Sequence, residues 1–313
     1  MSPLLLYLKM KTINMKKNLI VALFASAALT SAHAQADTIP SDWKLKAIYG
    51  LNGTQSSFVN WNAGGRNNIA LLGYVAASAK YEKNNLKWDN DFGAALGGMQ
   101  YLDKSVGNEL QKTDDRLEFA TNLGYRLKEH YYLSLLGSFR TQFIEGFDGD
   151  GLRTSTFMAP GYVNLSLGID YTPNDNFSAF LSPLASKMTF VTDPTLSAAG
   201  SFGVDPGDRF RGEFGAYFKM KYNKELFKNI EMKSKLELFS NYIENPQNID
   251  VNAEVLFSFK VNSWFSASLL WNLIYDDDIR ITDVNGNTGP RTQFKSVLGL
   301  GVSYTMKNYT ETK

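Results

Sequence analysis

Apolar and polar residues alternate one by one along most of the chain beyond residue 42. In the clearest example, residues 251–261, an apolar face of Val, Ala and Phe opposes Asn252, Glu254 and Lys260, and only Leu256 breaks the polar face. A period of two is typical of a β-strand with two different faces. The same alternation marks twelve segments: 43–53, 68–81, 86–100, 116–127, 131–143, 163–171, 177–190, 211–222, 230–238, 251–261, 264–275 and 294–307. We therefore predict an all-β protein.

The connections between these segments are alternately short and long. The short ones are 82–85, 128–130, 172–176, 223–229 and 262–263, and the long ones are 54–67, 101–113, 144–160, 191–210, 244–250 and 276–292. Outer-membrane barrels have short periplasmic turns and long extracellular loops. The pattern predicts a single antiparallel transmembrane β-barrel of about 12 strands, with both ends of the barrel domain in the periplasm.

Aromatic residues gather at the strand ends. Near the short turns lie Tyr81, Trp88, Tyr125, Tyr131, Tyr171, Phe177, Tyr222, Phe265 and Tyr304, and near the long loops lie Phe143, Phe190, Phe210, Tyr242, Tyr275 and Phe294. Amphipathic rings prefer the boundary between lipid and water, and membrane barrels carry an aromatic girdle at each boundary. We expect two such belts, one on each side of an apolar band.

The first 34 residues have the form of a secretory signal peptide. Lys16 and Lys17 precede an uncharged apolar stretch at 19–29, and the small-x-small pattern ending at Ala34 predicts cleavage before Gln35. Residues 1–14 precede a second candidate start at Met15, so a mis-called start is one interpretation. The predicted domains are a signal peptide at 1–34 and an outer-membrane β-barrel at 35–313, and the predicted location is the cell outer membrane.

Composition removes several other classes of protein. The 32 basic and 31 acidic residues give a net charge of +1, which provides no basic stripe for nucleic acid. With no cysteine, the chain can carry neither a lipoprotein anchor nor disulfides. No apolar run after the signal segment reaches the length of about 20 residues that a membrane-spanning helix needs. A membrane protein of this composition would have to cross as a barrel.

Segment 60–67, which contains Trp61, Gly64, Gly65 and Asn67, resembles the NW-x-x-GG-x-N signature of a Bacteroidota outer-membrane β-barrel family of unknown function, the domain of unknown function 3078 family. Further blocks that resemble this family lie at 112–115, 173–177, 180–184, 191–193, 245–251 and 273–278. The resemblance covers nearly all of the chain after the signal segment. It implies an outer-membrane barrel of a Bacteroidota-type bacterium, and it brings no catalytic residues.

Catalytic and metal-binding signals are weak. After the signal segment the only histidine is His130, in a predicted periplasmic turn, where a lipid-active or proteolytic site is not expected. Asp148 and Asp150 in the third long loop, and Asp276 and Asp278 in the sixth, are weak calcium candidates, because neither group completes a known calcium loop. Hydrated loop tips explain both groups more simply. We expect no enzymatic activity, no cofactor and no metal.

The inward phase of the strands carries most of the charged side chains that could act in function. Those predicted to line the lumen are Asp89, Asp91, Arg116, Glu118, Arg126, Arg140, Asp170, Glu213, Lys219, Lys221, Glu231, Lys233, Lys235, Glu237, Glu254, Lys260 and Lys295. These charges can line a water-filled path, or they can pair and fill the interior. About twelve strands lie between small, filled barrels and open porins of 16–18 strands.

The sequence favours a monomeric narrow channel or porin for small polar solutes. One alternative is a non-transporting scaffold whose loops bind a partner or a surface glycan. A second is a lipid-active outer-membrane enzyme. The expected partners are outer-membrane lipid and a small polar solute, without nucleic acid.

Overall fold

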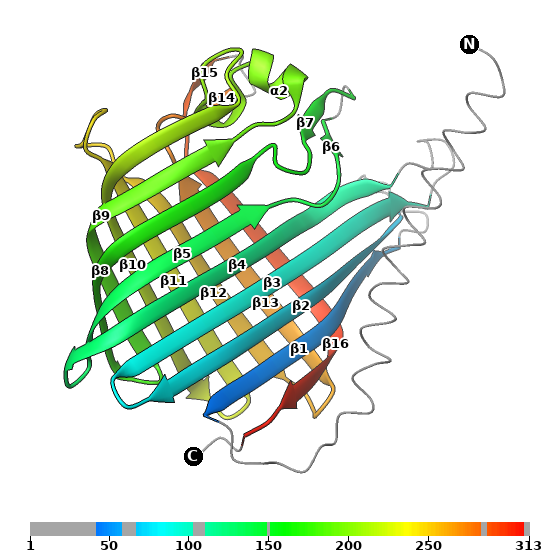
Figure 1. Cartoon of the computed structure of the whole chain (residues 1–313). Helices are drawn as coiled ribbons and strands as arrows, with labels where there is room; N and C mark the ends of the chain where they lie inside the picture. The colour runs from blue at the N-terminus through cyan, green and yellow to red at the C-terminus, as the bar shows by residue number, and fades with distance from the viewer. Residues whose placement is uncertain (1–41, 58–66, 103–109, 149–150, 283–286, 310–313) are drawn as a thin grey trace, which may run out of the picture. The chain divides into compact units, whose positions relative to one another are not determined.

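A computed structural model describes residues 42–57, 67–102, 110–148, 151–282 and 287–309. In this part of the chain twelve antiparallel strands form one closed barrel, and each pairs with its neighbours along the chain (Figure 1). The strands are β1 (Trp43–Ser56), β2 (Asn68–Lys83), β3 (Leu86–Tyr101), β4 (Gln111–Lys128), β5 (Tyr131–Thr141), β8 (Gly161–Asn174), β9 (Phe177–Phe190), β10 (Phe210–Phe227), β11 (Ile230–Asn241), β12 (Asp250–Lys260), β13 (Phe265–Tyr275) and β16 (Gln293–Lys307). Pairing between β1 and β16 closes the barrel.

All twelve predicted segments are strands, which confirms the fold class, but several strands are longer than predicted. β10 continues to Phe227, so the predicted connection 223–229 is wrong and only residues 228–229 form the turn. The turns between β2 and β3, between β4 and β5, and between β10 and β11 are tight. Each contains a residue with a left-handed φ angle: Asn84 at 55°, His130 at 66° and Asn229 at 70°. Beyond the apolar band both faces of a strand meet water, so alternation no longer marks the strand there.

The outer face of the barrel is apolar. Leu51, Leu71, Leu165 and Leu300 expose 50%, 51%, 48% and 54% of their surface, although they lie within long, well-paired strands. Many further large apolar side chains are exposed in the same way, which is far more than a soluble protein tolerates. A lipid-facing band accounts for this surface, and the barrel is therefore of the outer-membrane type. Among the described residues, no helix is long and apolar enough to cross a membrane.

Aromatic rings form contacting series at both ends of the strands. At the turn end, Tyr131 lies 4.8 Å from Tyr171, and the series continues through Phe177 to Tyr222. At the same end, the Trp43 ring lies 5.1 Å from Tyr81 and 5.5 Å from Trp88. At the loop end, Phe190 pairs with Phe210 and Phe214 with Tyr242. Several of the rings predicted for each end therefore lie in contact with another aromatic ring.

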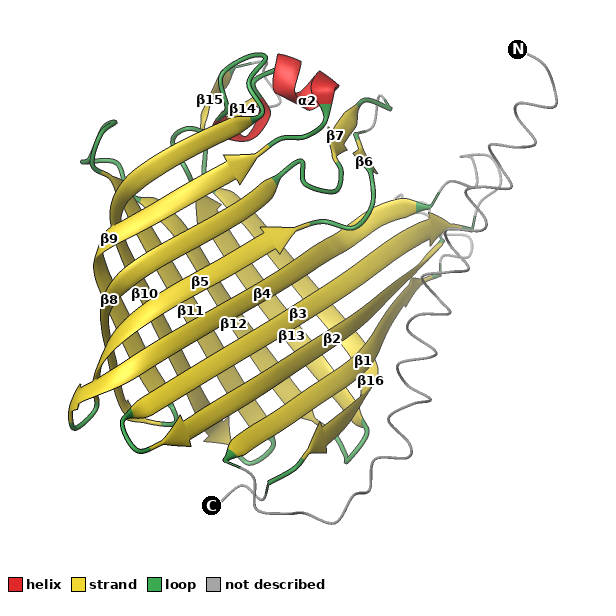
Figure 2. Cartoon of the chain, in the orientation of Figure 1, coloured by secondary structure: helices red, strands yellow, loops and turns green. Residues whose placement is uncertain are grey.

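Three of the long loops carry small elements of their own (Figure 2). These are the hairpin β6 (Gly146–Phe147) and β7 (Arg153–Ser155), the helix α2 (Pro194–Ala198) with the 3-10 turn η3 (Ser201–Gly203), and the hairpin β14 (Arg280–Thr282) and β15 (Thr288–Pro290). The third and fourth loops share a small apolar core of Ala159, Val191, Leu196 and Val204. Arg153 of β7 also forms an ion pair with Asp193, at 2.5 Å. The two loops therefore form one packed unit at the barrel mouth.

Asp193 also caps α2, and it offers a test of this unit. Its side chain accepts hydrogen bonds of 3.0 Å from the backbone N–H groups of Thr195 and Leu196. The Leu196 bond, assisted by Arg153, lowers the pKa of the Asp193 carboxyl. Since folding lowers this pKa, ionised Asp193 stabilises the loops above the ordinary carboxyl pKa of about 3.9. That stability is lost as the pH falls through the lower pKa of the folded state.

We expect Asp193→Asn to accelerate proteolysis within 191–210 severalfold at neutral pH, and wild-type loops to become cleavable by pepsin only at the acidic end of its range. Asp205→Asn provides the control, because Asp205 is an exposed acid of the same loop. Mass spectrometry of the fragments measures both rates. Equal rates in the two variants would contradict a stabilising role for the ionised Asp193 carboxylate.

Candidate functional site

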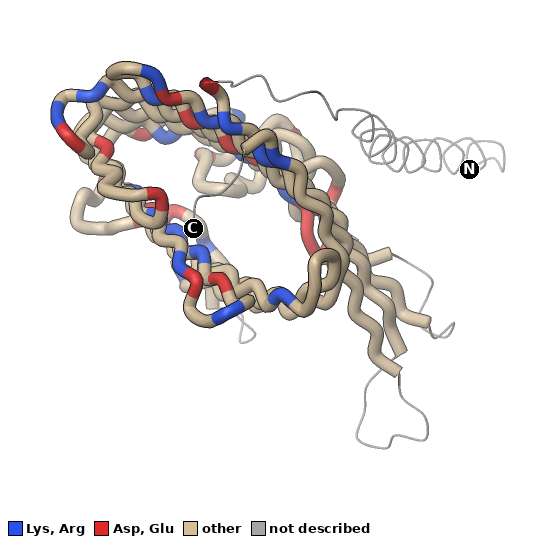
Figure 3. The backbone as a smooth tube through the Cα atoms, turned by 90° about the horizontal axis from the view of Figure 1, so that it is seen from below, with Lys and Arg blue, Asp and Glu red and all other residues tan. Residues whose placement is uncertain are grey.

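Lysine, arginine, aspartate and glutamate residues occur all around the barrel wall (Figure 3). Side chains of both signs make contacts inside the barrel. They come from the strand faces opposite the apolar band, as alternation requires. The guanidinium Nη1 of Arg116, in β4, lies 3.3 Å from the carboxylate Oε2 of Glu254, in β12. β4 and β12 are six strands apart in either direction around the barrel. Side chains from opposite walls therefore meet inside the lumen.

Other ion pairs also cross the interior. Lys295 of β16 contacts Asp114 of β4 at 3.0 Å, and Lys221 of β10 contacts Asp91 of β3 at 2.8 Å. None of these strands is adjacent to its partner. These contacts narrow the lumen at more than one level.

Glu237 of β11 is the centre of a hydrogen-bonded network on one wall. Its carboxylate accepts hydrogen bonds from the Tyr217 hydroxyl at 2.8 Å and from Asn252 Nδ2 at 3.0 Å. The ammonium groups of Lys219 and Lys235 lie 3.4 and 3.6 Å away. Two cations and two neutral donors around one carboxylate offset the cost of removing it from bulk water. This wall is therefore held in a fixed arrangement.

At the loop end of the lumen, two cations hold a group of carboxylates. Lys187 of β9 lies 2.6 Å from Asp250, 2.9 Å from Asp276 and 3.5 Å from Glu213. Arg211 of β10 binds Asp278 at 2.6 Å, Glu244 at 3.0 Å and the Gly203 carbonyl at 2.8 Å. Arg211 thereby connects the fourth and sixth loops at the mouth.

The calcium candidates of the sixth loop belong to this mouth cluster. Carboxylate oxygens of Asp250, Asp276 and Asp277 lie within 4.8 Å of one another, a spacing that could suit a cation. Lys187 and Arg211 already neutralise Asp276 and Asp278, so these two acids have protein partners. In the third loop, Asp148 accepts a hydrogen bond from the Leu152 backbone N–H at 2.8 Å. Asp150 lies outside the described residues.

The remaining predicted lumen residues lie nearer the turn end. Arg126 binds Glu82, Lys233 lies 3.5 Å from Glu231 on its own strand, and Lys260 is exposed at the end of β12. His130 occupies a turn, 3.7 Å from Glu129, with 45% of its side chain exposed.

Two other sets of predicted residues have little or no described structure. The cleavage residues Ala34 and Gln35 and the loop residues Trp61, Gly64 and Gly65 lie outside the described part of the chain. Asn67, at the base of the first loop, accepts a hydrogen bond from the Leu102 N–H through its backbone carbonyl.

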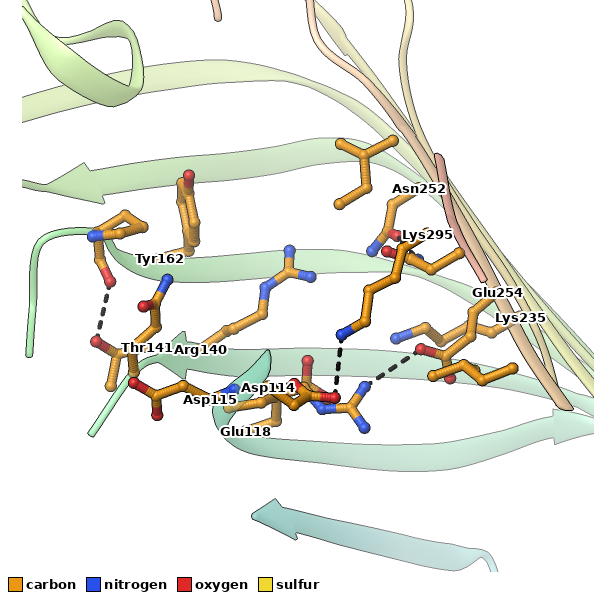
Figure 4. A pocket seen from close by; sticks show the side chains of 16 residues that line it. Asp114, Asp115, Glu118, Arg140, Thr141, Tyr162, Lys235, Asn252, Glu254 and Lys295 are labelled. Atoms are coloured by element: carbon orange, nitrogen blue, oxygen red, sulfur yellow. Dashed lines mark hydrogen bonds and ion pairs between the residues drawn. The ribbon is translucent and has the colours of Figure 1, made fainter. Parts of the chain in front are cut away.

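A pocket of ≈170 Å³ occupies the loop-side half of the lumen (Figure 4). Six predicted residues line it together: Arg116, Glu118, Arg140, Lys235, Glu254 and Lys295. They are joined by residues that sequence reasoning did not single out, including Asp115 and Tyr162. Its ionisable lining contains four acids, Asp114, Asp115, Glu118 and Glu254, and four cations, Arg116, Arg140, Lys235 and Lys295. The lining is therefore electrically balanced.

Lys187 and Arg211 were also missed as functional residues, for two different reasons. Lys187 lies in β9 beyond a register irregularity opposite Gly215 and Tyr217, where the alternation becomes less clear. Arg211 is the second residue of β10, at the edge of the predicted strand. For Lys187, one rule could have given a signal: a β-bulge inserts one extra residue, so the side chains that face inward shift by one position beyond it.

Comparison with known proteins gives fold-level similarities and one family match. No curated protein matches the chain in sequence. An outer membrane channel from Pseudomonas putida F1 is similar over 88% of this chain and 98% of its own, with 13% identity and a TM-score of 0.37. The NanC porin is similar over 82% of this chain and 98% of its own, with 8% identity and a TM-score of 0.38. The translocator domain of the Neisseria meningitidis autotransporter NalP is similar over 92% of this chain and 97% of its own, with 10% identity and a TM-score of 0.35.

The family match falls on the segment from the end of β1 to β6. Residues 54–147 match the family described as Protein of unknown function (DUF3078), which confirms the family resemblance over this segment.

Proposed function

We propose that this barrel is a narrow outer-membrane channel for small polar solutes, in which ion pairs between opposite walls set the width. The observation that carries the proposal is the Arg116–Glu254 contact across the lumen. Its two side chains keep 35% and 26% of their surface accessible, so water reaches the pair. Solvated ion pairs contribute only about 0–1 kcal/mol. Such a pair can open and close thermally, which suits a gate rather than a permanent plug.

The proposal includes the route to the membrane. We infer export by a cleaved signal peptide at 1–34, insertion as a monomer, and a Bacteroidota-type host. N-terminal sequencing of the outer-membrane form should begin at Gln35. An unprocessed N-terminus would contradict the export route without affecting the channel. No enzymatic step, cofactor or lipid-active site is part of the proposal.

A scaffold without transport is the second candidate, and the packed third and fourth loops favour it. Their shared apolar core and the Arg153–Asp193 ion pair give the mouth a defined surface that a partner or glycan could bind. Planar bilayers distinguish the two candidates. The refolded wild-type barrel should produce small, discrete current steps in potassium chloride. A correctly folded barrel that inserts but carries no current would favour the scaffold.

Charge reversal near the turn end should change ion selectivity. Lys233 lies in the inward phase of β11 beside Glu231. We expect Lys233→Glu to shift the reversal potential in a salt gradient towards cation preference, because two adjacent carboxylates then face the path. Lys224→Glu is the matched control, since Lys224 is exposed in the outward phase of the neighbouring strand. If both variants or neither shifted the potential, the ion path would not pass Lys233.

A further inference from the structure

Two charged residues of the lumen pocket differ from the other six. Asp114 binds Lys295, Arg116 binds Glu254, Asp115 binds Lys112, and Lys235 lies beside Glu237. Within the described part of the chain, the side chains of Arg140 and Glu118 form no hydrogen bond or ion pair, although both line the pocket. Figure 4 shows both side chains at the pocket without a dashed contact.

The backbone places these two groups side by side. Arg140 of β5 and Glu118 of β4 are register partners on neighbouring strands. The Arg140 guanidinium lies over the Tyr162 ring, 5.5 Å from its centre, which restrains its direction without using its N–H donors. A guanidinium offers a planar set of donors that matches a carboxylate in bidentate geometry. Arg140 is therefore prepared to bind a carboxylate, and Glu118 offers acceptors for an ammonium group.

The charge balance of the pocket selects among solutes. Four acids and four cations line it, so its formal charge is zero. A solute with net charge would leave one uncompensated charge in a narrow lumen, where hydration is weaker than in bulk water, and that is costly. A zwitterion adds no net charge and provides a carboxylate for Arg140 and an ammonium group for Glu118. We infer that this pocket is a binding site for a small zwitterion of the amino-acid or dipeptide class; the inference rests on the proposed channel function.

Current blockade in planar bilayers tests the inference with glycylglycine as the probe. A bound zwitterion should lower the wild-type single-channel current saturably, and acetate or ethylammonium at equal concentration should lower it much less. Hydrogen bonds to charged groups contribute enough that Arg140→Gln and Glu118→Gln should each raise the half-blocking concentration about tenfold or more. Arg140→Lys keeps the charge without the planar donors and should be intermediate. Arg209→Gln, an exposed arginine outside the pocket, should match wild type.

The outcomes separate this inference from the channel proposal. A wild-type current that glycylglycine does not block, or a blockade that survives in both glutamine variants, would overturn the zwitterion site and leave the channel intact. If the wild type carried no current, the channel proposal would fail. Isothermal titration of the detergent-folded barrel with glycylglycine would then decide the site alone. A saturable heat of glycylglycine binding that is lost in Arg140→Gln would support the zwitterion site. The absence of such a heat in the wild type would overturn the site.

Discussion

Replacing Arg116 and Glu254 together by alanine is expected to raise the single-channel conductance severalfold. These side chains come from opposite walls and meet at 3.3 Å, so their removal widens the lumen at the level where they now meet. The double variant keeps the net charge of the lumen unchanged, which separates width from ion selectivity. Single-channel recording in symmetric potassium chloride measures the effect.

The matched control removes an ion pair that does not cross the lumen. Lys233 and Glu231 lie on one strand, so replacing both by alanine leaves the opposite wall untouched. We expect a much smaller change in conductance from this control. Equal changes in the two double variants would mean that the Arg116–Glu254 pair does not limit the path.

Leu300→Arg is expected to destabilise the barrel in lipid vesicles by about 2–4 kcal/mol, the cost of an arginine on the lipid face at the bilayer midplane. Leu300 lies at the centre of β16 and exposes 54% of its surface outwards. Leu45→Arg is the control. Leu45 is also exposed, but it is the third residue of β1, at the turn end, where the cost falls to about 0–1 kcal/mol.

Equilibrium unfolding in denaturant, followed by tryptophan fluorescence in vesicles, compares the two variants. The apolar outer face and the aromatic belts together place Leu300 deep in the lipid and Leu45 near its boundary. Equal losses of stability would contradict that placement, and so would no loss in either variant.

The barrel could be predicted because lipid on one side and water on the other impose a two-residue period on every strand. This rule located all twelve strands, and it predicted inward phases for Arg116, Arg140 and Glu254, which line one pocket. It failed where the environment stops being two-sided. The polar end of β10 beyond Tyr222 read as a turn, although it continues as strand to Phe227.

The contacts inside the lumen could not be predicted in the same way. Alternation tells which side of the wall a residue faces, but it does not tell which residue of another strand stands opposite. That depends on the stagger between strands and on bulges such as those beside Gly215 and Gly98. The meeting of Arg116 with Glu254, and the bridge that Lys187 makes between Asp250 and Asp276, are consequences of that stagger.

The most direct test uses the absence of cysteine from the natural chain. Cysteines at positions 116 and 254 (Arg116→Cys with Glu254→Cys) can be joined by a short bis-maleimide while single-channel current is recorded. We predict one intramolecular link between β4 and β12, identified by mass spectrometry, and a current that falls as the link forms. A current that persists through a fully cross-linked barrel, or cysteines that never link, would contradict a conducting lumen whose width is set by side chains from opposite walls.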